Sequence, residues 1–280
     1  MKQRFAWFLT ILLATTNVPA QTGRSQWQRS TPAQRDPQLL HSVYAVNLPT
    51  SETLQKGDFE FEISHRFLSP IAKGKQTFMG IDGPVNMRLG LSYAVSNRFL
   101  TTVARSNVTD NWDFQIKMKA LQIRNESLPI VVALNGGFAY NDQVFGPIRS
   151  NSQRYQYYGQ LIINGMIADK IGLGLVPAYL YNSYLYSYEM QHTVTMGSYL
   201  QYYLSPNFSL LAEYIPTVSG WRESHNTMTI ALEIETGGHF FKIFVTNNAM
   251  INPSQNMMGA DLEFLKDMRL GFMITRLIKI

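Results

Sequence analysis

Cysteine is absent from this chain of 280 residues, which excludes a disulfide framework, a thiolate metal site and a lipoprotein anchor. Charged residues are also few: they make up 15% of the chain, against about 25% in ordinary soluble domains. After the N-terminus no apolar run reaches the roughly 18 residues that a membrane helix needs. A membrane role would therefore have to be carried by strands.

The net charge is +5, and the basic residues are scattered along the chain rather than clustered. A nucleic-acid surface needs a basic patch or stripe. We therefore expect no nucleic-acid partner and assign most of the charge to loops and to an internal face.

The clearest pattern lies at residues 85–106. Every second residue is apolar at the start of this stretch, namely Val85, Met87, Leu89, Leu91, Tyr93 and Val95. A period of two predicts a strand with one apolar face and one polar face. Ser96-Asn97 is a turn signal, and the alternation restarts at Phe99, so the stretch predicts a tight hairpin of two long strands.

The rest of the chain repeats this unit, with alternately short and long connections. Further strands are predicted at 59–67, 113–119, 130–139, 155–164, 172–181, 193–204, 208–214, 227–235, 239–245 and 268–276. The total of about twelve is even, as in bacterial barrels whose termini share the periplasmic side. We therefore predict an all-β fold, a closed up-and-down antiparallel transmembrane β-barrel with short periplasmic turns and longer extracellular loops.

The ends and long connections give weaker patterns. Residues 1–20 predict a signal peptide cleaved near Ala20, 21–56 a periplasmic tail that touches or enters the barrel, and 57–280 the barrel itself. Within the tail, Val43, Ala45 and Asn47 suggest a short strand that Pro49 ends. We expect loops at 217–226 and 246–267, the latter with a helical turn near Ala260–Leu265.

Aromatic residues test this topology, because bilayer interfaces select amphipathic rings. They are expected near the outer rim at Trp112, Phe138, Tyr140, Tyr155, Tyr157, Tyr179, Tyr181 and Tyr214, and near the inner rim at Tyr93, Phe99, Tyr202, Tyr203 and Phe208. The alternative is a soluble β-sandwich with aromatic core residues. Sandwich strands have about five or six residues, whereas several here approach the nine to eleven that cross a membrane.

If the apolar faces meet lipid, the polar faces point inward. The candidate lumen-lining residues are then Glu60, Glu62, Arg66, Arg88, Asp113, Lys117, Lys119, Glu213, Glu233, Glu235, Lys242 and Arg269. Such charges can sort solutes at a constriction, or they can form a salt-bridge network that closes the lumen. The sequence leaves both open, and the mixed signs argue against strong anion or cation selectivity.

Catalytic and metal sites find little support. His65 and His239 are candidates for a lipid hydrolase at the rim, but His65 and Ser64 point to opposite faces of their strand, and no G-x-S-x-G motif is present. With five histidines and no cysteine, and acidic residues without the spacing of a calcium loop, we expect no metal ligand. Gly172–Gly174 lies inside a strand, so no cofactor site is expected there.

Four short pieces together resemble one family: E-F-E-I-S-H-R-F (60–67), N-M-R-L-G-L-S-Y (86–93), R-F-L-T-T-V-A-R-S (98–106) and G-G-H-F-F-K-I-F-V-T-N (237–247). The family is a DUF5777-like group of outer-membrane β-barrel proteins common in Bacteroidetes, and the resemblance covers roughly Leu54 to the C-terminus. It implies a barrel, a leader and the outer membrane. It implies no established activity, so no site residue is carried over.

Three functions remain open at this point: a barrel that passes or binds an unknown small solute, a structural or adhesion barrel that uses outer loops such as Asn182–His192, and a rim lipid hydrolase. We favour the first and expect no enzyme. The expected location is the outer membrane of a Gram-negative bacterium. The expected partners are outer-membrane lipid and the insertion machinery.

Overall fold

The computed structural model describes residues 39–144, 151–187 and 189–279. The predicted leader and the first part of the tail, residues 1–38, lie outside the described residues. No described helix is long and apolar enough to span a membrane.

The described chain is almost entirely β-structure. The strands in the first half are β1 (Phe59–Phe67), β2 (Val85–Ser96), β3 (Phe99–Ser106), β4 (Asn111–Ile123), β5 (Ile130–Asn141) and β6 (Tyr155–Ile167). Those in the second half are β7 (Ile171–Tyr181), β8 (His192–Ser205), β9 (Phe208–Ile215), β10 (Thr217–Gly220), β11 (Thr227–Glu235), β12 (His239–Thr246) and β13 (Arg269–Ile278). Most run for eight or more residues, as the alternation predicts.

The strands close into an antiparallel barrel. Apart from the short β10, each strand pairs with the next along the chain: β8 pairs with both β7 and β9, β9 pairs with β11, and β1 pairs with β13. The short β10 also pairs with β8, beyond a break at Pro216, so it continues the line of β9. The barrel therefore has twelve strand positions around its wall, one of them shared by β9 and β10, which confirms the predicted fold class. The loop expected at 217–226 is wrong for its first four residues, which form β10.

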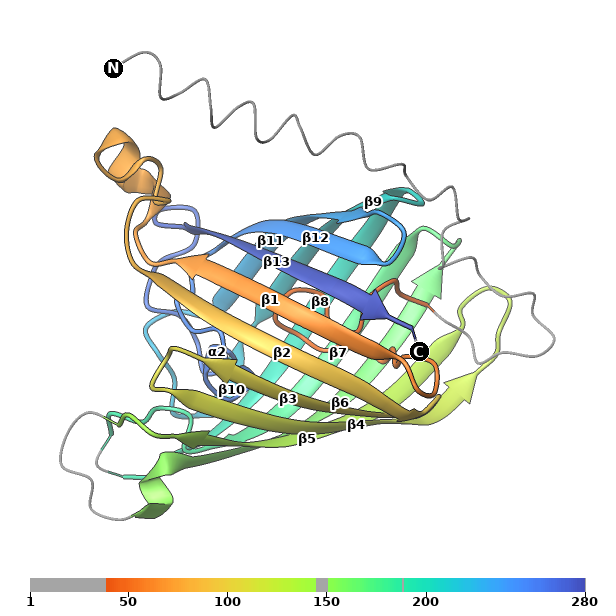
Figure 1. Ribbon diagram of the computed structural model, residues 1–280, viewed down its shortest axis with the longest axis horizontal. Coiled ribbons are helices and arrows are strands. Elements are labelled where there is room, and N and C mark those ends of the chain that lie inside the picture. Colours follow the sequence, from red (N-terminus) through yellow and green to blue (C-terminus); the bar gives the residue numbers. More distant parts are fainter. Residues whose placement is uncertain (1–38, 145–150, 188, 280) are drawn as a thin grey trace.

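Connections differ in length at the two ends (Figure 1). The termini of the barrel meet where Phe59 pairs with Ile278, and the short turns, such as Ser96–Phe99, lie at the same end. There the Ser96 hydroxyl accepts hydrogen bonds from the backbone N–H groups of Arg98 and Phe99, which fixes the hairpin. The long connections 68–84, 142–154, 182–191 and 247–268 lie at the opposite end, which is the extracellular end of such barrels.

Three short helices occur in the described chain. The 3-10 segments are η2 (Ile71–Thr77) and η3 (Asn151–Arg154), and the one α-helical turn is α2 (Pro253–Asn256). The helical turn expected at Ala260–Leu265 is wrong: the turn lies earlier, where Pro253 starts α2 and all four of its residues are buried.

The outer surface of the barrel is apolar. Leu89, Leu91, Ile116, Leu134 and Leu200 are among the large apolar side chains exposed on it. Exposed rings flank this band, at Trp112, Phe138, Tyr155, Tyr157, Tyr179 and Tyr214 toward the long loops and at Tyr93, Phe99, Tyr202 and Phe208 toward the short turns. Tyr203 does not join the inner girdle as expected: it points inward and is buried, because its neighbour Tyr202 takes the outward position.

Candidate functional site

The lumen of the barrel is the candidate site, and chain segments fill it. Residues 39–54, here called the inner plug, are buried or half-buried throughout. In Figure 1 this segment, redder than the orange β1, lies inside the ring of strands. Residues 247–260, here called the outer plug, fold inward from the β12–β13 connection and carry α2.

The inner plug is irregular rather than a strand. The backbone N–H of Ala45 donates to Leu48 O at 2.9 Å and that of Thr50 to Val43 O at 3.0 Å, which makes a tight turn. Its only β-type pairing within the described chain is the isolated bridge between Tyr44 and Pro49. The short strand suggested for Val43, Ala45 and Asn47 is therefore wrong, because the turn occupies those residues.

Apolar contacts anchor the inner plug against glycines of the wall. A Cβ atom added to Gly172 would lie 2.4 Å from Leu40 Cδ2, and one added to Gly197 would lie 2.9 Å from Leu48 Cδ2. These leucines are fully buried. The same apolar cluster includes Met257 and Met258 of the outer plug and Ile162, Val176 and Tyr199 of the wall, so both plugs and the wall share one core.

Polar contacts join the inner plug to charged wall residues. The Glu213 carboxylate accepts the backbone N–H groups of Val46, Asn47 and Leu48 at 2.7, 2.9 and 3.1 Å. Lys117 Nζ donates to Val43 O at 2.9 Å and to Thr50 O at 3.0 Å. These wall charges are buried, and burial is tolerated because each meets hydrogen-bond partners of the plug.

Further contacts hold the plug at its sides. Lys119 pairs with Glu52 at 3.1 Å, and Glu52 in turn accepts the N–H of Leu39 at 2.8 Å. The Tyr44 hydroxyl donates to Gln115 Oε1 at 2.6 Å. Burial raises the pKa of Tyr44 well above its ordinary value, so this hydroxyl keeps its proton and remains a donor.

The predicted lumen residues all point inward and are buried: Glu60, Glu62, Arg66, Arg88, Asp113, Lys117, Lys119, Glu213, Glu233, Glu235, Lys242 and Arg269. Some of them pair within the wall. Arg88 bridges Glu62 at 2.7 Å and Asp113 at 3.2 Å. Lys242 pairs with Glu233 at 3.2 Å. Opposite charges therefore compensate one another around this part of the lumen.

The remaining members of the set make other contacts. Arg66 donates to the Asn47 side chain of the plug, Glu60 interacts electrostatically with Lys242, and Glu235 lies 3.6 Å from the ring of His41. Arg269 reaches the end with the long connections, where it pairs with Asp261 at 2.6 Å. The structure thus brings most of the set together around the inner plug and places Arg269 at the outer one.

The outer plug is held mainly by amides. Asn248 Nδ2 donates to Thr227 Oγ1, Asn256 O and Gly259 O at 2.7 to 2.8 Å. Ser254 and Gln255 reach Gln156 of the wall, and Gln160 donates to the Met257 sulfur at 3.1 Å. Sequence reasoning missed these residues. A usable signal existed, since residues 246–260 carry no charge although they were expected to form an exposed loop.

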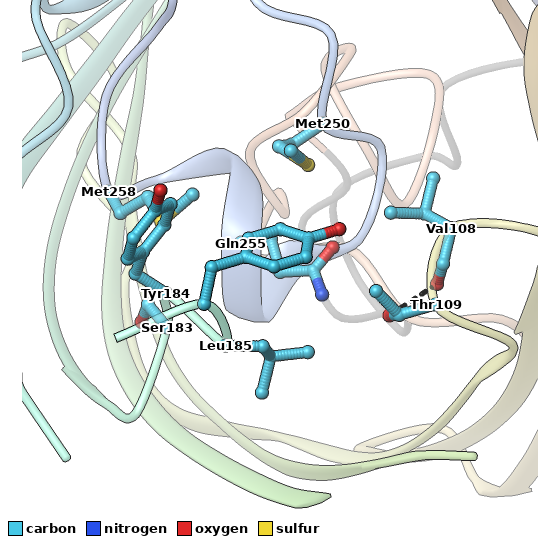
Figure 2. Close-up of a pocket in the computed structure, with 9 residues that line it drawn as sticks. Val108, Thr109, Ser183, Tyr184, Leu185, Met250, Gln255 and Met258 are labelled. Carbon is cyan, nitrogen blue, oxygen red and sulfur yellow. Dashed lines mark hydrogen bonds between the residues drawn. The ribbon is translucent and has the colours of Figure 1, made fainter. Parts of the chain in front are cut away.

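A small pocket lies between the outer plug and the rim. Figure 2 shows Met250, Gln255 and Met258 of the outer plug together with Val108, Thr109, Ser183, Tyr184 and Leu185 from neighbouring connections; Tyr186 completes the lining. The pocket has room for about one water molecule. Tyr184 stacks on Trp221 with ring centroids 4.3 Å apart, so part of the 182–191 connection packs inward.

The two candidate histidines lie apart. His65 stacks on Phe272 in the half of β1 nearer the long connections, with centroids 4.6 Å apart, and His239 stacks on Phe241 at the other end. Among the described residues no group of three or more His, Asp or Glu side chains could hold a metal ion. The two histidines therefore lie too far apart to act at one site.

A closed barrel with twelve strand positions, an apolar outer band and a charged interior defines a membrane-bound β-barrel of the outer-membrane type. The sequence matches the family described as "Membrane bound beta barrel domain (DUF5777)" over residues 40–278. The chain therefore belongs to this family.

Several solved barrels are similar in chain trace. The NanC porin shares 9% identity and a TM-score of 0.47, covering 79% of this chain and 99% of that one. The KdgM porin shares 10% identity and a TM-score of 0.47, covering 78% of this chain and 98% of that one. An outer membrane channel from Pseudomonas putida F1 shares 14% identity and a TM-score of 0.47, covering 81% of this chain and 98% of that one. No curated protein matches the sequence.

Proposed function

We propose that the protein is a porin-like passage for a small polar solute and that the inner plug closes it in the conformation described. The observation that carries this proposal is the set of wall charges, Lys117, Lys119 and Glu213, whose hydrogen-bond partners belong to the plug. Withdrawal of the plug would leave these side chains lining a polar lumen. Their mixed signs fit a solute with little net charge.

The proposed setting is the outer membrane of a Gram-negative bacterium. A leader cleaved near Ala20 would direct export, and the insertion machinery would place the apolar band in lipid. The role needs no chemistry, cofactor or metal. It is supported by the membership in a membrane-bound barrel family and by the polar interior.

A disulfide that locks the plug tests the proposal in the full chain. In Leu48→Cys/Gly197→Cys, the new side chains face each other where the leucine methyl groups lie 2.9 and 3.1 Å from a Cβ atom added to Gly197, so we expect a disulfide to form between them. Since the chain has no cysteine, no other disulfide can form. We expect the oxidised protein to conduct no ions in planar bilayers and a reducing agent to raise its conductance to at least the level of the unmodified chain.

The control places a disulfide within the wall. Ser92 and Thr102 face each other on β2 and β3, with hydroxyl oxygens 2.8 Å apart, so Ser92→Cys/Thr102→Cys restrains two strands without touching the plug. Its conductance should be the same when oxidised and reduced. A plug-gated passage would be refuted if the Leu48→Cys/Gly197→Cys protein conducted equally when oxidised and when reduced. It would also be refuted if neither that protein, in either redox state, nor the unmodified chain conducted at all.

The adhesion hypothesis keeps one supporting observation. Tyr186 and Met190 of the 182–191 connection expose 47% and 40% of their surface, although Leu185 beside them is buried. Exchange of residues 186–190 for a Gly/Ser sequence should abolish cell-surface binding if this loop meets a partner. Unchanged binding after the exchange would remove the adhesion function.

A further inference from the structure

The wall of the lumen recognises the main chain of the inner plug more than its side chains. Glu213 accepts three successive backbone N–H groups, from Val46 to Leu48. Asn164 Oδ1 accepts the N–H of Ser51 at 2.6 Å, and the Tyr203 hydroxyl accepts that of His41 at 3.2 Å. The acceptors of the wall are thus directed at peptide N–H groups.

Two lysines of the wall donate to peptide carbonyl groups of the plug. Lys117 Nζ binds both Val43 O and Thr50 O, at the two ends of the tight turn. Lys242 Nζ binds Tyr44 O and the Ser42 hydroxyl. Ammonium groups on carbonyl oxygens and a carboxylate on N–H groups are charge-assisted hydrogen bonds, which are shorter and stronger than neutral ones.

The wall also provides shaped apolar sites beside these polar groups. Gly172 and Gly197 leave depressions that hold Leu40 and Leu48, and Val176 and Ile162 add to the same cluster. Main-chain hydrogen bonds combined with sites for spaced side chains are the general basis of peptide recognition.

From this arrangement we infer that the lumen is a peptide-binding site, that the inner plug is its built-in ligand, and that the solute is an oligopeptide. A dedicated carboxylate on three adjacent N–H donors suits a peptide, since every peptide presents such donors whatever its side chains. An anionic solute would meet the Glu213 carboxylate unfavourably. The inference rests on the proposed passage for its physiological meaning, but the binding itself can be measured separately.

The test displaces the plug and leaves the wall intact. In Leu40→Asp/Leu48→Asp the two anchoring side chains become charged and lose their apolar contacts, so the plug should leave the lumen. A fluorescently labelled synthetic peptide of residues 39–56 is then titrated onto the full-length variant in detergent micelles. We expect saturable binding by fluorescence anisotropy, and no binding to the oxidised Leu48→Cys/Gly197→Cys protein, whose site is occupied.

Main-chain recognition is tested with the same peptide methylated at the amide nitrogens of Val46 and Leu48. Methylation removes two donors to Glu213 and changes no side chain. We expect its affinity to fall at least tenfold, because a buried carboxylate then loses hydrogen bonds that nothing replaces. The comparison peptide carries Asn47→Ala, which keeps all three N–H groups, and it should lose less affinity. Equal affinity of the methylated and unmethylated peptides would overturn the inference.

The class of solute is tested by competition. An unlabelled mixture of eight-residue peptides of random sequence should displace the labelled peptide, and a mixture of neutral oligosaccharides at the same concentration should not. Displacement by the oligosaccharides alone would overturn the assignment. If Leu40→Asp/Leu48→Asp fails to fold, the milder Leu40→Ala/Leu48→Ala, which removes the same two anchors and leaves the wall unchanged, takes its place in each titration.

Binding and conductance separate the two proposals. Peptide binding without any conductance would refute the passage and support the inference. If the plug-displaced protein conducts, but the 39–56 peptide neither binds it nor blocks the conductance, the passage is supported and the inference is refuted.

Discussion

At the scale of single residues, the period of two decides the direction of each side chain. Glu60, Glu62, Arg88 and Lys242 alternate with apolar residues in sequence, and all are buried inside the barrel. Their direction could be predicted because it depends only on neighbours in the strand. Their partners could not, since the groups that bind Glu213 lie about 165 residues away in the chain. The need for glycine at Gly172 depends in the same way on the distant Leu40.

Substitution of Gly172 tests this close approach. A valine at this position would force its Cβ against Leu40 Cδ2, at 2.4 Å in the present arrangement. We expect Gly172→Val to lower the free energy of unfolding by about 1–3 kcal/mol, the usual cost of overpacking, as measured by urea unfolding in micelles. In the control Gly159→Val, on β6, an added Cβ meets nothing within 4 Å. Equal stability of the two variants would contradict the contact.

At the scale of elements, strands were more predictable than the segments between them. The alternation locates the long strands to within a few residues. It misses β10, because Pro216 interrupts the pattern between β9 and β10. The two plugs follow no simple period, because irregular segments bury side chains on all sides. Their composition is informative instead: residues 246–260 carry no charge, and residues 39–54 contain one carboxylate, Glu52, and one histidine, His41.

One amide, that of Asn248, links several parts of the outer plug to the wall. Asn248 Nδ2 joins Thr227 of the wall to two carbonyl groups of the plug, so Asn248→Ala leaves buried acceptors without this donor. We expect amide hydrogen exchange across 247–260 to become at least tenfold faster while exchange in the strands stays the same. The control Asn125→Ala removes an exposed amide at a turn of the opposite end. Unchanged exchange at 247–260 in Asn248→Ala would show that other contacts hold the segment.

At the scale of the whole molecule, the apolar groups have two destinations. Outward-facing ones form the lipid-facing band, and inward-facing ones join a core built from the wall and both plugs. The sequence predicted the closed barrel because the band must continue around it. Whether the lumen was open or filled stayed undecided, since that depends on how segments far apart in sequence pack inside it.

The lipid-facing band predicts a dependence on depth. Ile116 is 60% exposed near the middle of β4, and Ile123 is 46% exposed at the end of the same strand. An arginine costs about 2–4 kcal/mol at the bilayer midplane and about 0–1 near an interface. We expect Ile116→Arg to lower the stability of the barrel in lipid vesicles by that larger amount and Ile123→Arg by the smaller. Equal costs would contradict the membrane placement of β4.

The position of the inner plug at the start of the described chain has a consequence for the order of assembly. Val46 is synthesised early, but Glu213 follows 167 residues later, and Lys242 follows its partner Ser42 by 200. Contacts of such long sequence separation form only after a large loop has closed. The inner plug therefore cannot form these contacts until nearly every strand of the barrel is in place, and its docking is the step that completes the native molecule.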